Sequence, residues 1–254
     1  MVLPVLLALA VAPGIFWLWY FLARDRLHPE PRRLVLRVFF LGAGAAIASG
    51  LAEAYFFRAA GIRLPGARFF QLLAGAAAVG LIEEGTKFLS VYAGIYRNAE
   101  FDEAIDGIVY AVSAAMGFAT LENLQYVLGG GAAVGIARML TAVPAHAFFG
   151  AMMGYGMGMA RFAGRKEGAY LLTGFGAAAV GHAAWDALAF SGSVFSLALL
   201  PGVVILWRRA VSLSSRAQAA DGLRGRGHAS VEALPAIPPL RSKAWAIPRS
   251  GGRR

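Results

Sequence analysis

The chain has 254 residues, of which 58% are hydrophobic and 15% are charged, and its mean hydropathy is +0.60. This composition excludes a soluble globular domain, which would carry a much larger charged fraction. The formal net charge of +10 does not indicate nucleic-acid binding, because Lys and Arg lie between hydrophobic runs and near the C-terminus and not on one amphipathic face. The absence of cysteine excludes disulfides and thiol chemistry, so any catalysis must use His, Asp, Glu or hydroxyl groups.

Apolar stretches of about 20 residues, the length that crosses a bilayer, recur from the N-terminus to about residue 208. The first is followed by Arg24 and Arg26 and has no basic segment before it, so it is predicted to be a membrane span and not a signal peptide. Bounded by charges, Pro or Gly, about seven spans are predicted at 2–23, 34–60, 69–96, 107–128, 143–161, 169–190 and 193–208.

Residues 131–142 are too few to span a bilayer and contain Arg138, so they predict a short interfacial or re-entrant helix. The predicted fold is therefore all-α, a polytopic transmembrane helix bundle forming one domain over 1–208. Residues 209–254 are rich in Ser, Gly, Pro and Arg, which predicts a basic, disordered cytoplasmic tail that can contact anionic lipid headgroups.

Loop charges predict the orientation of the chain in the cell membrane. Basic residues follow the first span, at Arg24, Arg26, Arg32 and Arg33, and the fifth, at Arg161, Arg165 and Lys166, and they recur in the tail. These segments lie on one side only if the number of spans is odd. Cytoplasmic loops carry the excess of Lys and Arg, so the N-terminus is predicted outside and the C-terminus in the cytoplasm.

Several polar side chains fall within the predicted spans, where a charge costs about 2.5–3.5 kcal/mol on insertion scales. They are Glu53, Glu83, Glu84, Lys87, Glu122, Asn123, His146, His182 and Asp186. Each such residue therefore needs a partner or a function.

The third predicted span places Lys87 between Glu83 and Glu84 around the helix, because successive residues are about 100° apart. Lys87 can neutralise one carboxylate, and the other can then accept a proton from water as a general base. The alternative is a structural ion-pair cluster that joins helices.

The other polar residues fall at similar depths. His182 and Asp186 are four residues apart and share a helix face, which suits either a structural hydrogen bond or a catalytic pair. Glu122 can serve catalysis or simply pair with Arg138. With seven spans, Glu122, His146, His182 and Asp186 lie in outer helix halves and the paired glutamates lie near the midplane, which predicts one outward-opening polar site.

Two mechanisms suit these residues. Glu122, His146 and His182 are acceptable Zn²⁺ ligands, which leaves Glu83 or Glu84 to activate the bound water. The same site works without metal if a glutamate activates water while histidine and Asn123 stabilise the oxyanion. The chain has no HExxH motif, and the residues alone do not choose between the two mechanisms.

The motifs EEGTK (83–87), FATLEN (118–123), HAFFG (146–150) and HAAWD (182–186) resemble, in order and spacing, those of the PrsW family of intramembrane proteases. The resemblance covers roughly residues 75–190, and the wider group includes the type II CAAX prenyl proteases. It implies cleavage of a single-pass membrane-anchored substrate, such as the first extracytoplasmic cut of an anti-sigma factor. By position, Glu83, Glu84, Glu122, His182 and Asp186 match the family's motif acids and histidine. The resemblance leaves a metalloprotease and a glutamate mechanism without metal both open.

Two other functions remain open at this point. Acidic and histidine residues inside membranes also mark proton relays, which suggests a proton-coupled transporter. A non-catalytic membrane scaffold could retain the same residues for packing alone. Intramembrane proteolysis is the function that the sequence favours.

Overall fold

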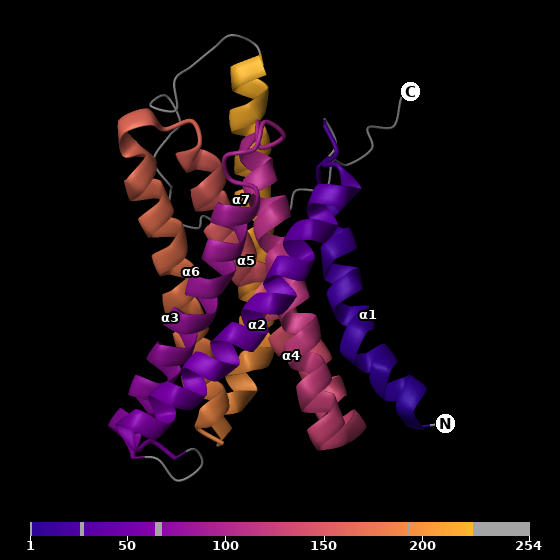
Figure 1. Ribbon diagram of the computed structural model, residues 1–254, viewed down its shortest axis with the longest axis vertical. Helices are drawn as coiled ribbons and strands as arrows, with labels where there is room; N and C mark the ends of the chain where they lie inside the picture. Colours follow the sequence, from indigo (N-terminus) through magenta and orange to yellow (C-terminus); the bar gives the residue numbers. More distant parts are fainter. Residues whose placement is uncertain (1, 26–27, 64–67, 193, 226–254) are drawn as a thin grey trace, which may run out of the picture.

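The computed structural model describes residues 2–25, 28–63, 68–192 and 194–225, and every regular element within them is a helix. This confirms the all-α prediction. Figure 1 shows that successive long helices alternate in direction between the two ends of the molecule. They are α1 (Val2–Leu22), α2 (Arg32–Ala60), α3 (Phe69–Gly94), α4 (Ala104–Leu140), α5 (Ala142–Ala160), α6 (Glu167–Phe190) and α7 (Leu199–Gly225), with short 3-10 turns η1 (Gly164–Lys166) and η2 (Val194–Ala198).

Four helical segments in the described part of the chain are long and apolar enough to cross a membrane. They are Leu3–Leu22, Arg32–Ala60, Ala104–Ala160 and Val194–Arg224. Helices α3 and α6, which carry most of the intramembrane polar residues, are not among them. The count of seven spans therefore stays a prediction.

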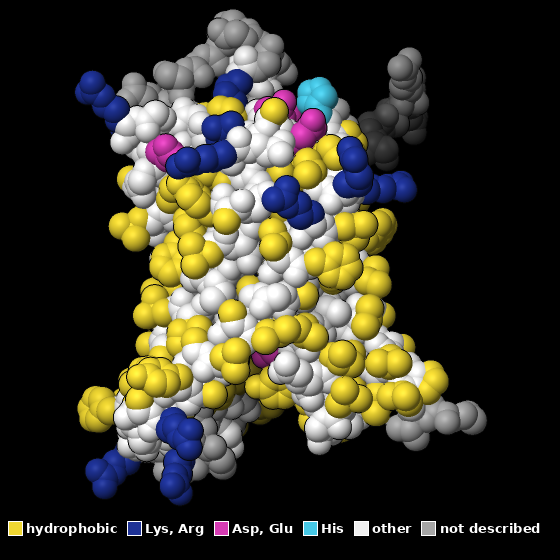
Figure 2. Space-filling view, viewed as in Figure 1, with side chains coloured by type: hydrophobic (Ala, Val, Ile, Leu, Met, Phe, Trp, Pro, Cys, Tyr) yellow, Lys and Arg dark blue, Asp and Glu magenta, His cyan; other side chains and the backbone are white. Residues whose placement is uncertain are grey.

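On the face shown in Figure 2, a broad hydrophobic band lies between ends that carry Lys and Arg. Large apolar side chains such as Phe40, Leu51, Leu172 and Val180 are mostly exposed on this surface. Such extensive apolar exposure suits contact with lipid and not with water. The centre of the bundle is formed by α4 and α5, whose 57-residue stretch is 89% buried in its most apolar window.

Small residues set the close approach of the central helices. A Cβ atom added at Gly107 on α4 would lie 2.3 Å from the carbonyl oxygen of Gly154 on α5, and one at Gly42 on α2 would lie 2.0 Å from that of Ala114 on α4. Lipid offers no hydrophobic driving force between helices, so close backbone packing at small residues replaces it.

Helix α4 reverses direction at Gly131, whose backbone has φ 75° and ψ −168°, a conformation that is essentially limited to glycine. Residues 132–140 then turn back as a short helix, so that Gly135 packs against Val127. This is the segment predicted to be interfacial or re-entrant. The reversal brings Arg138 beside the end of the first part of α4, where its Nε donates to Asn123 Oδ1 at 3.0 Å.

The structure differs from the sequence prediction over residues 209–225, which continue α7 and were expected to belong to a disordered tail. Ala210, Leu213, Ala217 and Ala220 recur at helical spacing and are buried. Mostly alanines, these residues give a weak hydrophobic signal that the surrounding Arg and Ser residues obscured. The remainder of the predicted tail, 226–254, lies outside the described residues.

The contact at Gly107 gives a prediction for stability. We expect Gly107→Ala to lower the free energy of unfolding in detergent by about 1–3 kcal/mol, because its methyl group would overlap the α5 backbone. Gly176→Ala on α6 is the matched control, since nothing lies within 4 Å of its Cβ position. Thermal unfolding of both variants measures the difference, and equal melting temperatures would contradict this packing.

Candidate active site

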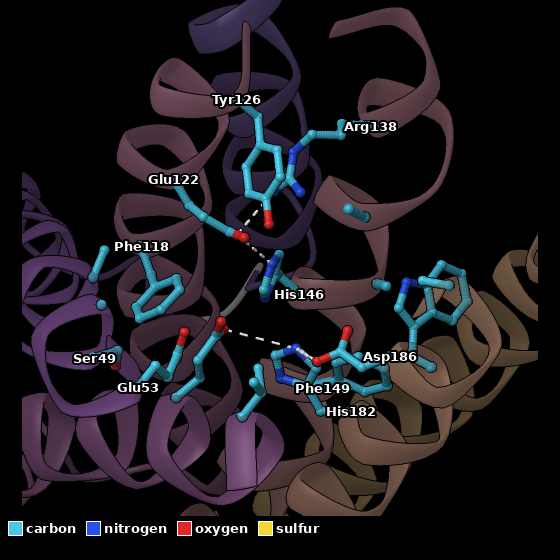
Figure 3. Close-up of a pocket in the computed structure, with 18 of the residues that line it drawn as sticks. Ser49, Glu53, Phe118, Glu122, Tyr126, Arg138, His146, Phe149, His182 and Asp186 are labelled. Carbon is cyan, nitrogen blue, oxygen red and sulfur yellow. Dashed lines mark hydrogen bonds and ion pairs between the residues drawn. The ribbon is translucent and has the colours of Figure 1, made fainter. Parts of the chain in front are cut away.

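A cavity of about 580 Å³ opens between the helices at the end of the bundle where α5 begins and α6 ends. Figure 3 shows charged and imidazole side chains converging on it from α2, α4, α5 and α6. Residues predicted from four separate spans line this one space, namely Glu83, Glu122, His146, His182 and Asp186, and Glu53 joins them from α2. The helix bundle therefore brings these residues together around one cavity.

Lys87 lies at the centre of the polar residues and is completely buried. Its Nζ donates to Glu83 Oε2 at 3.0 Å and to Glu84 Oε1 at 2.8 Å, as the helical angles predicted. It also lies 3.0 Å from Nδ1 of His146 and 4.0 Å from the ring centre of Phe118. The three ammonium protons thus have three acceptors, and the aromatic face adds a cation–π contact.

The Lys87 contact determines the protonation of His146. An ammonium group can only donate hydrogen bonds. Nδ1 of His146 must therefore accept from Lys87, and Nε2 carries the ring proton. Nε2 then donates to Glu122 Oε2 at 2.9 Å. Glu122 also pairs with Arg138, whose Nη2 lies 2.8 Å from Oε2. The predicted pairing of Glu122 with Arg138 is therefore present together with the contact to histidine.

His182 is oriented differently. Its Nδ1 donates to Glu84 Oε1 at 2.8 Å, which leaves Nε2 directed at the cavity. Nε2 lies 3.5 Å from Asp186 Oδ2 and 3.7 Å from Glu83 Oε2. The ring stacks on Phe149 with centroids 5.2 Å apart. A carboxylate that fixes the far nitrogen of an imidazole is the arrangement that positions a histidine for metal binding or proton transfer.

The two adjacent glutamates differ in access to the cavity. Glu84 is fully buried and is held by Lys87 and His182, whereas Glu83 lines the cavity and is slightly exposed. Only Glu83 can therefore meet a water molecule or a substrate there. Glu84 affects the site through the two groups that donate to it, Lys87 and His182.

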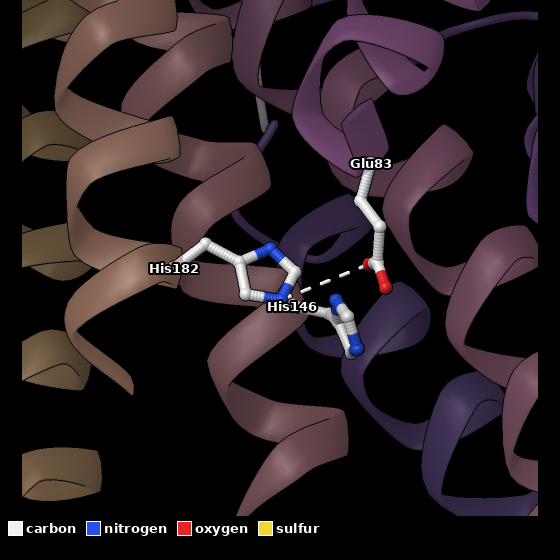
Figure 4. A group of neighbouring side chains, drawn as sticks. All are labelled: Glu83, His146 and His182. Carbon is white, nitrogen blue, oxygen red and sulfur yellow. Dashed lines mark ion pairs between the residues drawn. The ribbon is translucent and has the colours of Figure 1, made fainter. Parts of the chain in front are cut away.

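Glu83, His146 and His182 each offer a ligand atom, and these atoms lie within 4.8 Å of one another (Figure 4). Two imidazoles and a carboxylate are a donor set that zinc accepts. His182 already presents Nε2, and Asp186 Oδ2 beside it is buried without a hydrogen-bond partner in the described structure. The residues therefore fit a metal ion, although His146 would have to exchange one of its two hydrogen bonds for it.

Two further residues have clear positions. Asn123 is fully buried, and its Nδ2 donates to the carbonyl oxygens of Leu9 and Ala10 on α1, so its amide protons are committed to helix packing. Glu53 faces the cavity with Oε1 unpartnered among the described residues.

The sequence indicated only that Arg138 could pair with Glu122, yet Arg138 also lines the cavity as a cation. The triple glycine at 129–131 was the signal for the reversal that places it there.

Lys87 should be essential for the stability of the site. We expect Lys87→Met to lower the free energy of unfolding by about 3–5 kcal/mol, because two buried carboxylates lose their counterion. Adding Glu84→Gln to this variant should recover part of the loss, since one buried charge is then removed. Thermal unfolding of both variants tests this, and a Lys87→Met protein as stable as the parent would rule out the central role of the ammonium.

Comparison with known proteins identifies the family of the chain. The model of the PrsW family of intramembrane metalloproteases matches residues 30–209. Protease PrsW of Geobacillus kaustophilus (strain HTA426) is 35% identical over 240 residues, covering 94% of this chain and 99% of that protein. Protease PrsW of Bacillus subtilis (strain 168) is 34% identical over 203 residues, covering 80% and 90%. No solved structure gives a significant match. The chain therefore belongs to the PrsW family of intramembrane metalloproteases.

Proposed function

We propose that this protease hydrolyses a peptide bond of a membrane-anchored protein in the cavity, with Glu83 accepting the proton of the attacking water. The observation that carries the proposal is the difference between the paired glutamates, because Glu83 reaches the cavity and Glu84 does not. Membership of a protease family favours hydrolysis over the transporter and scaffold alternatives.

The chain's own groups can perform each part of the reaction. Water gives a proton to Glu83, and its oxygen forms a bond to the substrate carbonyl carbon. The developing negative charge on the carbonyl oxygen lies within the field of Arg138 and the Nε2–H of His146, both at the cavity wall. As the carbon–nitrogen bond breaks, the proton passes to the leaving amine. His182, with Nε2 facing the cavity, is placed to carry it.

A metal ion would be held by Glu83, His146 and His182, and Glu83 and His182 would then be ligands in place of the base and the proton carrier. When bound, such an ion polarises a carbonyl group and lowers the pKa of water to near 7 in known enzymes. Glu84 would then serve as the partner that orients His182, and Lys87 would keep Glu84 ionised. The set predicted from sequence had Glu122 in place of Glu83. Its pairing with Arg138 and His146 favours a supporting role for Glu122.

The proposed substrate is a single-pass membrane protein cut near the outer membrane surface, such as an anti-sigma factor. The α1–α2 connection, the α5–α6 connection and the end of α7 lie at one end of the molecule (Figure 1), and basic residues recur in these segments. We place this end in the cytoplasm, with all seven helices crossing the membrane. The cavity is nearer the opposite end, and a substrate segment would enter it from the outer side.

Glu83→Gln is the direct test. We expect it to reduce the rate of cleavage of a single-span substrate in detergent by about 10²–10⁴-fold, the usual contribution of a general base. Glu84→Gln should cost less, because a glutamine oxygen can still accept the His182 proton. Glu100→Gln, an exposed acid in the α3–α4 connection, is the control and should cleave like the parent. A larger loss for Glu84→Gln than for Glu83→Gln would contradict the assignment of the base.

Metal content tests the ligand set separately from activity. Purified protein that cleaves substrate should contain about one zinc ion per chain, as tetrahedral catalytic sites do. His182→Ala should lose the ion, because its Nε2 is the ring nitrogen already turned to the cavity. Elemental analysis before and after treatment with a chelator provides the measurement. Full activity in metal-free protein would instead support catalysis by Glu83 without a metal.

A further inference from the structure

A second group of carboxylates lies at the other end of the bundle, outside the protease site. Asp25 follows α1, Glu30 precedes α2, and Asp106 is in the first turn of α4. Each offers one oxygen, and these oxygens lie within 4.8 Å of one another. Residues from two separate parts of the chain, the α1–α2 connection and the start of α4, therefore converge at one point.

The three acids differ in their partners. Glu30 accepts from the hydroxyl of Tyr110, and Asp106 Oδ2 accepts from the backbone N–H groups of Asp102 at 2.9 Å and Glu103 at 2.6 Å. Asp106 Oδ1 is buried without a hydrogen-bond partner in the described structure. Asp25 is 95% buried, and no side chain donates a hydrogen bond to its carboxylate oxygens there, although the backbone N–H groups of His28 and Glu30 approach them. A nearly inaccessible carboxylate that has no cation beside it and lies close to two others points to a missing positive charge.

The neighbouring cations are used elsewhere. Arg224 pairs with Asp221, whose two oxygens accept from the backbone N–H groups of Ala104 and Ile105 and so cap α4. His28 is largely exposed and pairs with Glu103 at 2.8 Å. Arg24 lies over the ring of Tyr20. No Lys or Arg among the described residues, which do not include Arg26, forms an ion pair with Asp25, Glu30 or Asp106.

The pKa values of the two acids in the α1–α2 connection are raised. Burial, followed by the charge of Glu103, raises the pKa of Asp25 to about 6. Burial likewise raises the pKa of Glu30 to about 7. The positive end of the α4 helix dipole favours anions nearby, but the backbone N–H groups of Ala104 and Ile105 at this end donate to Asp221.

We propose that Asp25, Glu30 and Asp106 bind a hard divalent cation, Mg²⁺ or Ca²⁺. Carboxylate oxygens alone are the ligands that these two ions prefer, whereas the absence of nitrogen and sulfur donors disfavours zinc or copper. The cation ties the end of α1 and the start of α2 to the first turn of α4. It is a structural site, separate from the protease cavity and independent of the proposed mechanism.

The test uses the purified full-length protein in detergent after removal of metal with a chelator. Mg²⁺ and Ca²⁺ are titrated separately while thermal unfolding is recorded. Each ion that binds should raise the melting temperature of the parent in a concentration-dependent manner, because only the folded state brings the three acids together. Tb³⁺ luminescence provides direct detection, since Tyr110 contacts Glu30 and can sensitise the ion.

Asp25→Asn is the critical variant, because Asp25 forms no ion pair in the described structure and an asparagine oxygen can still accept from the backbone N–H groups of His28 and Glu30. It should weaken Tb³⁺ binding by at least ~10-fold, equivalent to ~1.4 kcal/mol, and abolish the shift in melting temperature. In the metal-free protein it should raise the melting temperature, since it removes an uncompensated charge. If Asp25 had only a packing role, its substitution would change the melting temperature in the same direction with and without the cation. Glu30→Gln is the second variant and should behave similarly.

Two controls separate this site from others. Glu100→Gln removes an exposed acid from the same end of the molecule and should retain the full response to cations. His182→Ala removes a ligand of the protease cavity and should also retain it. The proposal is overturned if neither ion shifts the melting temperature of the parent, or if the shift persists in Asp25→Asn or is lost in His182→Ala.

Discussion

The ammonium group of Lys87 is the interaction on which the protease site depends. Two adjacent carboxylates, Glu83 and Glu84, would be prohibitively unfavourable in a bilayer without a cation between them. The same group fixes which nitrogen of His146 carries the proton, and so directs that histidine at Glu122. One buried cation thus stabilises the two carboxylates of α3 and fixes the tautomer of His146 on α5.

Close helix packing makes this arrangement attainable. The imidazole of His182 reaches Glu84 only because α3 and α6 approach closely, and a Cβ atom at Gly80 on α3 would lie 2.7 Å from the backbone of Ala179. Small residues play the same part between α4 and α5. The two glutamates differ because of this packing, which buries Glu84 between helices and leaves Glu83 at the cavity.

Helix α4 connects two polar regions with different character. Near its middle, Glu122 belongs to the protease cavity, where every acid lies close to a basic or imidazole group or lines open space. At its start, Asp106 belongs to the acidic group with Asp25 and Glu30, where no such partner is described. Membrane burial alone explains neither. The first is compensated by cations within the chain, and the second is where we propose that a cation from solution binds.

The sequence by itself determined the membrane character, the helical fold and the identity of the polar residues, because apolar runs and intramembrane charges are local properties. Helical spacing was enough to place Lys87 between Glu83 and Glu84. It could not show which glutamate meets the cavity, that Asn123 is held by α1, or that residues 209–225 are helical. Those features depend on contacts between segments far apart in the chain. The group of Asp25, Glu30 and Asp106 was equally inaccessible, since its members are ordinary loop and helix-end acids until folding buries them together, as only the tertiary structure decides.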